Sequence, residues 1–236
     1  MRKKSVRDTS KLLRGFDRAT KRVQGYLHAR HGEAATRILV ARARSEYERL
    51  IPELPDLHGR QPFTRFVVTT AWTLAFYRAL AASEAPEKEA GELAYALTAD
   101  YVQSVPRIAA RLIEWFWFSK LFRRRLRLRA QQSQQRRQSG AFVYQYVEGC
   151  AGEFDFGVDY LECAVLTFLE AQGAPELAPY ICVLDQASSE AFGWGLTRTT
   201  TLAEGSSRCD FRFKRGGATR LASTVLPGME WNVNDL

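Results

Sequence analysis

Residues 142–147 read Phe-Val-Tyr-Gln-Tyr-Val, and this short stretch decides how the chain divides. Its β-branched and aromatic residues are typical of a strand. It follows Ser139-Gly140, and the residues upstream of that break place apolar side chains at helical spacing instead. We therefore predict a helical half over residues 1–138 and a mixed half over residues 139–236.

Five helices are predicted in the first half from the 3.6-residue period and from proline punctuation. Their approximate ranges are 9–27, 33–50, 63–82, 86–104 and 107–138. Residues 51–62 contain three prolines and predict an ordered turn that carries His58.

The second half is expected to alternate between short helices and strands. We predict helices over residues 160–172 and 175–191, then strands over 194–202 and 208–214 joined by a hairpin loop at 204–207. This pattern indicates an α+β fold, in which an N-terminal helical half packs on a small antiparallel sheet with helices of its own. No repeat or linker separates the halves, so we expect a single domain over residues 1–236.

Composition limits the classes of protein that fit. The chain has 236 residues, 46% of them hydrophobic, which is enough for a sizeable core. The basic N-terminus lacks a following apolar region, and the longest apolar run, residues 66–80, is too short and polar to span a bilayer. Four cysteines without a secretory signal favour reduced thiols. We expect a cytoplasmic protein without a membrane partner.

The net charge of +8 raises the question of nucleic-acid binding. The excess lies in the first thirty residues and in residues 123–137, which are Gln-rich and have no aromatic side chains. A solvated or anion-steering surface fits this distribution better than nucleic acid does. The expected partners are a small-molecule substrate and, at most, a second copy of the chain.

Three of the four cysteines lie in compact polar motifs in the last third of the chain. The motifs are Asp159-Tyr160-Leu161-Glu162-Cys163, Cys182-Val183-Leu184-Asp185, Leu196-Thr197-Arg198-Thr199-Thr200-Thr201 and Cys209-Asp210-Phe211-Arg212-Phe213. A core requires neither carboxylates nor guanidinium groups beside its thiols, whereas a site for a polar, electrophilic small molecule uses all three.

In order and spacing these motifs resemble the L-2-amino-thiazoline-4-carboxylic acid hydrolase family. Its pattern is roughly a glycine and an aspartate, then DYxEC, CxxD, LxRTxTLAxG and CDFR. Two positions depart from it: Leu161 replaces a residue that is often small and polar, and Cys150 is an additional thiol. The resemblance implies hydrolytic opening of a five-membered ring at a C=N carbon, which converts an aminothiazoline carboxylate into a carbamoylated cysteine.

The candidate catalytic residues are Cys163, Asp185, Asp159 and Cys182. Cys163 is expected just inside a helix capped by Asp159, where the helix dipole would lower its pKa and favour a thiolate nucleophile. A water activated by Asp185 or Asp159 is the alternative nucleophile. Cys182 and Asp185 are three residues apart on a predicted helix and share a face. Each thiol also has a simpler interpretation as a small buried apolar group.

The candidate substrate-binding residues are Arg198, Thr200, Cys209, Asp210 and Arg212. Either arginine could clamp a carboxylate with two parallel hydrogen bonds. On its strand Cys209 alternates with Phe211, so Asp210 and Arg212 point to the opposite face, as a reactive pair or as a surface ion pair. 

If the motifs form one site, five side chains converge between the helices and the sheet. They are Cys163, Cys182, Asp185, Arg198 and Cys209.

Two rival interpretations remain. The cysteines are 19 and 27 residues apart with no Cys-x-x-Cys, and all three histidines lie in the helical half, so neither a metal nor another cofactor is predicted. The chain also resembles 4-vinyl reductase-like ligand-binding domains, which implies a small-molecule sensor without turnover. In a sensor, the aromatic run at residues 115–118 would line the ligand site; otherwise it is helix core. An accessory protein that has lost the chemistry is a third interpretation.

Overall fold

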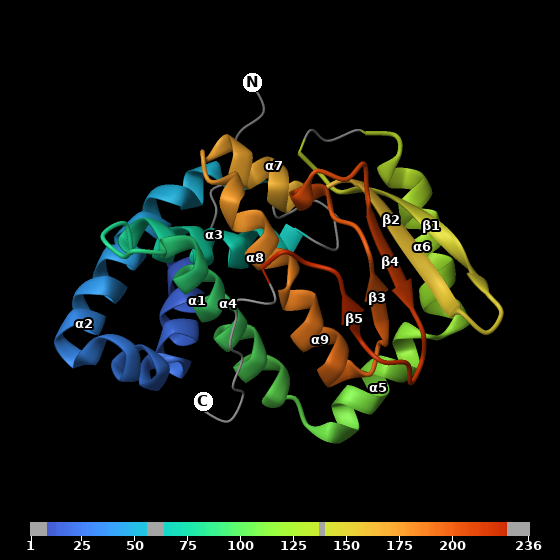
Figure 1. The fold of residues 1–236 in the computed structure, drawn as a ribbon, viewed down its shortest axis with the longest axis horizontal. Helices are drawn as coiled ribbons and strands as arrows, with labels where there is room; N and C mark the ends of the chain where they lie inside the picture. The colour runs from blue at the N-terminus through green and yellow to red at the C-terminus, as the bar shows by residue number, and fades with distance from the viewer. Residues whose placement is uncertain (1–8, 56–63, 137–139, 226–236) are drawn as a thin grey trace.

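The structure, a computed structural model, describes residues 9–55, 64–136 and 140–225 (Figure 1). Its helices and its sheet form the predicted α+β arrangement. The N-terminal helices are α1 (Thr9–Arg22), α2 (Gln24–Leu50), α3 (Thr64–Ala79), α4 (Pro86–Gln103), α5 (Arg107–Trp117) and α6 (Lys120–Ser133). The later helices are α7 (Ala164–Ala171), α8 (Ala178–Cys182) and α9 (Leu184–Phe192), with 3-10 turns at Ile51–Glu53, Pro175–Leu177 and Leu202–Glu204.

Five strands form one sheet in the order β1-β2-β4-β3-β5. They are β1 (Val143–Cys150), β2 (Phe154–Glu162), β3 (Leu196–Arg198), β4 (Cys209–Phe213) and β5 (Arg220–Leu221). All neighbours pair antiparallel except β3 and β5, which are parallel. α8 and α9 lie between helices α1–α4 and this sheet, whereas α6 lies alongside β1 (Figure 1).

The helical half differs from the prediction at three breaks. The helix predicted over residues 9–27 is interrupted at Val23, which separates α1 from α2. The expected gap before residue 33 is a kink inside α2, where Gly32 has φ 74° and interrupts the helix. The single helix predicted over residues 107–138 is divided instead into α5 and α6. Ser119 is extended there, and its hydroxyl accepts a hydrogen bond from the Phe122 amide at 3.1 Å, so it begins a new helix.

The helix predicted over residues 160–172 was placed too early, because residues 154–162 form strand β2. The strand pairing shows this, because Val158 of β2 lies opposite Tyr146 of β1 on one side and opposite Phe211 of β4 on the other. Only Ala164–Ala171 is helical. The predicted strand over residues 194–202 is likewise shortened to β3, because the chain turns away after Arg198.

The two faces of the sheet differ in character. Phe156, Val158, Leu196 and Phe213 are buried on the inner face, in one core cluster with residues of the N-terminal helices. Because side chains alternate along a strand, Asp159, Asp210 and Arg212 belong to the outer face. This division determines which of the predicted site residues can meet.

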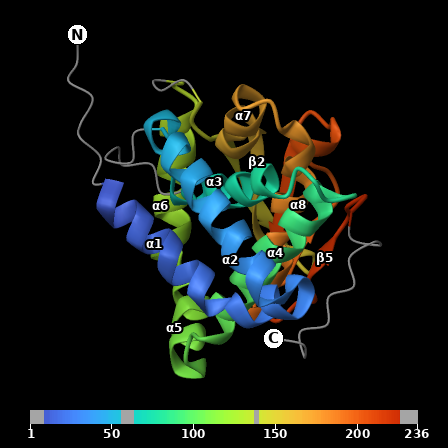
Figure 2. The ribbon, with the colours of Figure 1, turned by 90° about the vertical axis from the view of Figure 1, so that its left-hand side faces the viewer.

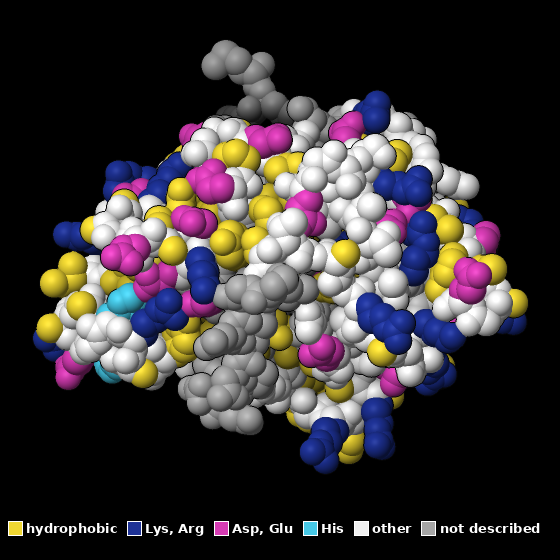
Figure 3. All heavy atoms as spheres, in the orientation of Figure 1, with side chains coloured by type: hydrophobic (Ala, Val, Ile, Leu, Met, Phe, Trp, Pro, Cys, Tyr) yellow, Lys and Arg dark blue, Asp and Glu magenta, His cyan; other side chains and the backbone are white. Residues whose placement is uncertain are grey.

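No helix within the described residues is long and apolar enough to cross a bilayer. Basic and acidic side chains are interspersed over much of the face shown in Figure 3.

Candidate active site

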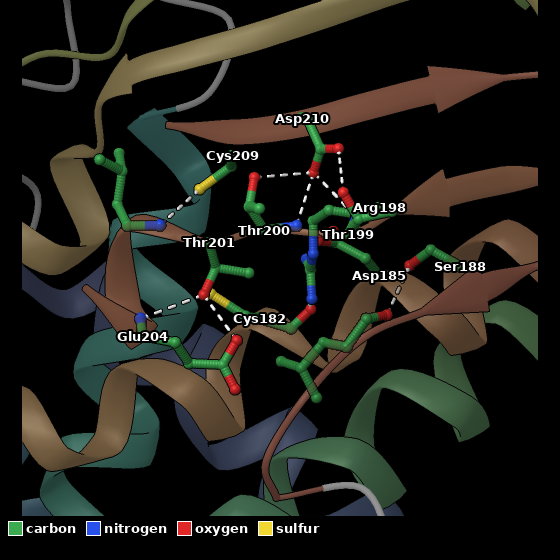
Figure 4. Close-up of polar contacts among 12 residues, drawn as sticks. Cys182, Asp185, Ser188, Arg198, Thr199, Thr200, Thr201, Glu204, Cys209 and Asp210 are labelled. Carbon is green, nitrogen blue, oxygen red and sulfur yellow. Dashed lines mark hydrogen bonds and ion pairs between the residues drawn. The ribbon is translucent and has the colours of Figure 1, made fainter. Parts of the chain in front are cut away.

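Five of the predicted residues come together where the inner face of the sheet meets α7, α8 and α9. Cys163 directly precedes α7, Cys182 ends α8, and Asp185 lies in the first turn of α9. Arg198 ends β3 and Cys209 begins β4. The three thiols, Asp185 and Arg198 are close enough to influence one another's ionisation. We call these five residues the thiol–arginine cluster, and Figure 4 labels Cys182, Asp185, Arg198 and Cys209 of them.

Arg198 is the most completely buried member, with 1% of its side chain exposed. Its Nη1 donates to the Asp185 carboxylate at 2.7 Å and to the Cys182 carbonyl oxygen at 3.0 Å. The guanidinium lies over the Phe211 ring, 5.4 Å from its centroid. Its Nε and Nη2 are buried and have no acceptor among the described residues. Those two N–H groups form one edge of the guanidinium, the edge that pairs side-on with a carboxylate.

Asp185 combines deep placement with access to solvent. Burial raises its pKa above the ordinary value, although the neighbouring Arg198 opposes that shift. Even so, 38% of its side-chain surface is accessible. Oδ2 of Asp185 accepts the hydrogen bond from Arg198, and Oδ1 takes no part in that bond.

The thiols of the cluster are held in the neutral form. Burial raises the pKa of Cys163 and Cys182, and raises that of Cys209 to about 11. The lowered pKa predicted for Cys163 is therefore wrong. Cys163 precedes α7 without making a side-chain capping bond, and the first-turn amides of α7 offset only part of the burial effect. The predicted cap, Asp159, is not at a helix end at all.

Tyr160 is a further member of the site that the sequence analysis missed. It lies opposite Cys209 in the sheet register, and its ring contacts that of Phe211 at 5.1 Å. Burial raises its pKa well above the ordinary value, and nearby Asp185 and Cys163 add to the shift. Tyr160 is the tyrosine of the DYxEC motif, but the helix expected over residues 160–172 did not place its ring on a face of the sheet.

Asp210 supports the site without belonging to the cluster. Its carboxylate accepts four hydrogen bonds of 2.5–3.0 Å, from the backbone amides and the hydroxyls of Thr199 and Thr200. Burial alone would raise its pKa, but these bonds outweigh burial and lower it. Asp210 and Thr200, both predicted to bind substrate, instead hold the loop that follows Arg198.

The same loop is fixed at its far end by a second set of bonds. Thr201 Oγ1 accepts from the Glu204 amide at 3.1 Å and donates to the Glu204 carboxylate at 2.9 Å. The Leu202 amide donates to the Cys209 sulfur at 3.2 Å. The LxRTxTLAxG and CDFR motifs are therefore joined by hydrogen bonds that set the position of Arg198 (Figure 4).

Asp159 and Arg212 form a cross-strand pair on the outer face of the sheet. Arg212 Nη1 donates to Asp159 at 2.7 Å, and Arg208 lies 3.6 Å from the other carboxylate oxygen. Gly157 makes room for this pair, because a Cβ there would lie 2.9 Å from Arg212 Cδ. The sheet separates Asp159 and Arg212 from the thiol–arginine cluster, so their placement does not support the expected roles of Asp159 in catalysis and of Arg212 in substrate binding.

Within the described residues, no group of three or more His, Cys, Asp and Glu side chains is arranged to hold a metal ion. His31 pairs with Glu89 at 2.7 Å, far along the chain from the cysteine motifs. His58 lies outside the described residues.

A helical layer packs on a small sheet, and thiols, a carboxylate and a buried guanidinium meet at their junction, so the chain is an α+β protein with a candidate site there. The chain belongs to the L-2-amino-thiazoline-4-carboxylic acid hydrolase family, whose model matches residues 65–213. The match runs from α3 to the end of β4 and includes the whole thiol–arginine cluster, which confirms the resemblance found in the motifs. No curated protein and no solved structure matches the chain.

Proposed function

We propose that the protein hydrolyses a small heterocyclic carboxylate of the thiazoline or cyclic amidine type, and opens the ring at its C=N carbon. The family name supports a hydrolase of such a compound. The observation that carries the proposal is the unpartnered Nε–Nη2 edge of Arg198 beside the accessible Asp185. The Arg198 edge suits a substrate carboxylate, and the Asp185 carboxylate suits activation of the attacking water.

The edge of Arg198 is assigned to the substrate carboxylate. A buried donor without an acceptor costs roughly 1–3 kcal/mol, so two such donors on one guanidinium favour a bound anion. Nη1 already neutralises Asp185, and this leaves a flat, two-donor edge whose geometry matches a carboxylate.

Asp185 is assigned as the general base. Water adds its oxygen to the C=N carbon and its proton passes to Asp185, whose raised pKa makes it a better base than an ordinary carboxylate. The added oxygen then forms a C=O bond as the bond from that carbon to a ring heteroatom breaks. The departing heteroatom and the nitrogen of the former C=N bond each gain one proton, which accounts for the two protons of the water. One water is consumed and one ring bond is lost.

The thiols are assigned as neutral donors that line the site. Burial keeps Cys163, Cys182 and Cys209 protonated near neutral pH, which disfavours direct attack by a Cys163 thiolate. A protonated thiol beside the reacting carbon can supply the proton that the leaving heteroatom needs. Asp185 raises the pKa of all three thiols, which places each of them near the proposed base.

The aromatic run at residues 115–118 does not support the sensor interpretation. Trp115 and Phe116 are exposed on α5. Trp117 stacks on Trp194 at 4.3 Å, and Phe118 packs against Phe156. The run is thus divided between surface and core, and the charged cluster remains the better ligand site.

The test is a comparison of three substrates with the purified protein. They are an aminothiazoline carboxylate, the same ring without its carboxylate, and the corresponding open-chain carbamoyl compound. We expect a product heavier by one water, with a new free thiol, from the first compound only. Equal turnover of the compound that lacks the carboxylate would remove the role of Arg198, and binding of the ring without any product would favour a sensor.

A further inference from the structure

Helix α5 leaves an apolar stripe uncovered. Ile108, Leu112 and Trp115 are 76%, 62% and 62% exposed, and their spacing of four and three residues places them on one side of the helix. Phe116 beside them is 38% exposed. Trp117 of α5 packs against the core cluster, but Ile108, Leu112 and Trp115 are not part of that cluster, so packing against it does not explain them. An uncovered apolar stripe of this kind marks a contact surface.

The surroundings of the stripe are strongly basic. Residues 107–129 contain eight Lys and Arg but a single acidic residue, Glu114, whose carboxylate is paired with Arg215 at 3.0 Å. Leu121 of α6 adds a further apolar side chain, 52% exposed. In Figure 3, basic and hydrophobic side chains lie together at the lower end of the molecule, the end that α5 forms in Figure 1. We call this combination the α5–α6 surface.

The charge and shape of the α5–α6 surface select its occupant. A second copy would bring two strongly basic surfaces together, and these would repel each other. A peptide needs a concave seat, whereas α5 projects at one end of the molecule in Figure 2. An anionic lipid layer meets both requirements, because acyl chains cover the stripe while phosphate groups pair with the basic side chains.

We propose that α5 and the start of α6 dock the protein on an anionic lipid surface. The helix lies in the plane of the interface with Leu112 and Trp115 inserted, and Arg124 and Arg125 contact headgroups. This differs from the sequence-based expectation of no membrane partner, which considered only spanning segments. It is independent of the proposed hydrolase activity, because the α5–α6 surface and the thiol–arginine cluster share no residue.

The experiment is vesicle flotation of the full chain. Phosphatidylcholine vesicles are compared with vesicles that contain about 30% phosphatidylglycerol, at low salt and at about 0.5 M salt. We expect binding to the anionic vesicles at low salt, at least tenfold weaker binding at high salt, and none to phosphatidylcholine alone. Absence of binding to the anionic vesicles overturns the proposal.

Matched variants locate the contact. Leu112→Ser with Trp115→Ser should weaken binding by roughly tenfold or more, because the variant loses its inserted side chains. The control, Ile38→Ser with Phe66→Ser, changes side chains that are each 56% exposed on α2 and α3 and should bind as the parent does. Thermal unfolding checks that both variants fold. Equal losses in the two variants contradict the proposal.

Charge is tested in the same way. Arg124→Gln with Arg125→Gln should weaken binding by roughly tenfold, and Arg14→Gln with Arg18→Gln on α1 should have little effect. If the parent binds no vesicles but forms a dimer that Leu112→Ser abolishes, the surface belongs to a second copy and the lipid proposal is wrong.

Discussion

Replacing Arg198 by lysine separates substrate recognition from structural support. Lysine keeps a positive charge that can reach Asp185, but it removes the Nε–Nη2 edge, which has no acceptor among the described residues. Hydrogen bonds to charged groups are worth about 1.5–3 kcal/mol. If the edge binds the substrate carboxylate, we expect Arg198→Lys to lose about 2–3 kcal/mol of preference for the carboxylate, roughly 30- to 150-fold in kcat/KM.

The assay is steady-state kinetics on a ring carboxylate and on its carboxamide. The loss should appear mainly in KM, because the carboxylate is held equally in the ground state and the transition state. Arg212→Lys makes the same chemical change on the outer face of the sheet, where Arg212 pairs with Asp159, and it should keep the parental preference. Arg198→Ala is less informative, because it leaves Asp185 without its partner and destabilises the fold.

The reasoning is refuted if Arg198→Lys discriminates against the carboxamide as strongly as the parent does. In that case the buried guanidinium serves only to hold Asp185 and the Cys182 carbonyl oxygen. A fall in thermal stability with unchanged discrimination would give the same conclusion.

Two further predictions concern the thiols and the loop after β3. At about pH 8, iodoacetamide should label exposed Cys150 in the folded protein and leave Cys163, Cys182 and Cys209 unmodified. The reason is that burial raises the pKa of these three thiols. Peptide mapping that finds Cys163 labelled as fast as Cys150 would contradict this prediction. The lowered pKa of Asp210 stabilises the fold above the ordinary carboxyl pKa, and this contribution is lost as the pH falls through the folded value. Thermal unfolding of Asp210→Asn should therefore show a smaller loss of stability than the parent between about pH 5 and pH 2, and equal losses would contradict it.

The sequence predicted most of the N-terminal helices because their apolar side chains recur locally at the helical period. β2 was missed because its identity depends on partners distant in sequence. Val158 is a strand residue because Tyr146 and Phe211 lie on either side of it. That error placed Asp159 at a helix end, whereas the expected pKa shift of Cys163 failed for another reason, because burial outweighs the effect of the α7 amides.

The part of the candidate site that depends on the alternation of side chains along β4 was predictable from the sequence. The assignment of Cys209 and Phe211 to one face of β4, with Arg212 on the other, is confirmed by their contacts. Whether the charged face or the thiol face meets the helices depends on packing, which no local pattern encodes. The role of Asp210 as the support of a loop was equally hidden, because its hydrogen-bond partners lie ten and eleven residues earlier in the chain.

The most direct test of the hydrolytic site is the rate of ring opening by Asp185→Asn, with Asp159→Asn as its matched control. Both variants replace a carboxylate by an amide of the same shape, one in the thiol–arginine cluster and one on the outer face of the sheet. We predict that the parent and Asp159→Asn open an aminothiazoline carboxylate at similar rates, while Asp185→Asn loses about 10²- to 10⁴-fold in kcat. Undiminished ring opening by Asp185→Asn, or an equal loss in Asp159→Asn, would contradict the assignment of the thiol–arginine cluster as the hydrolytic site.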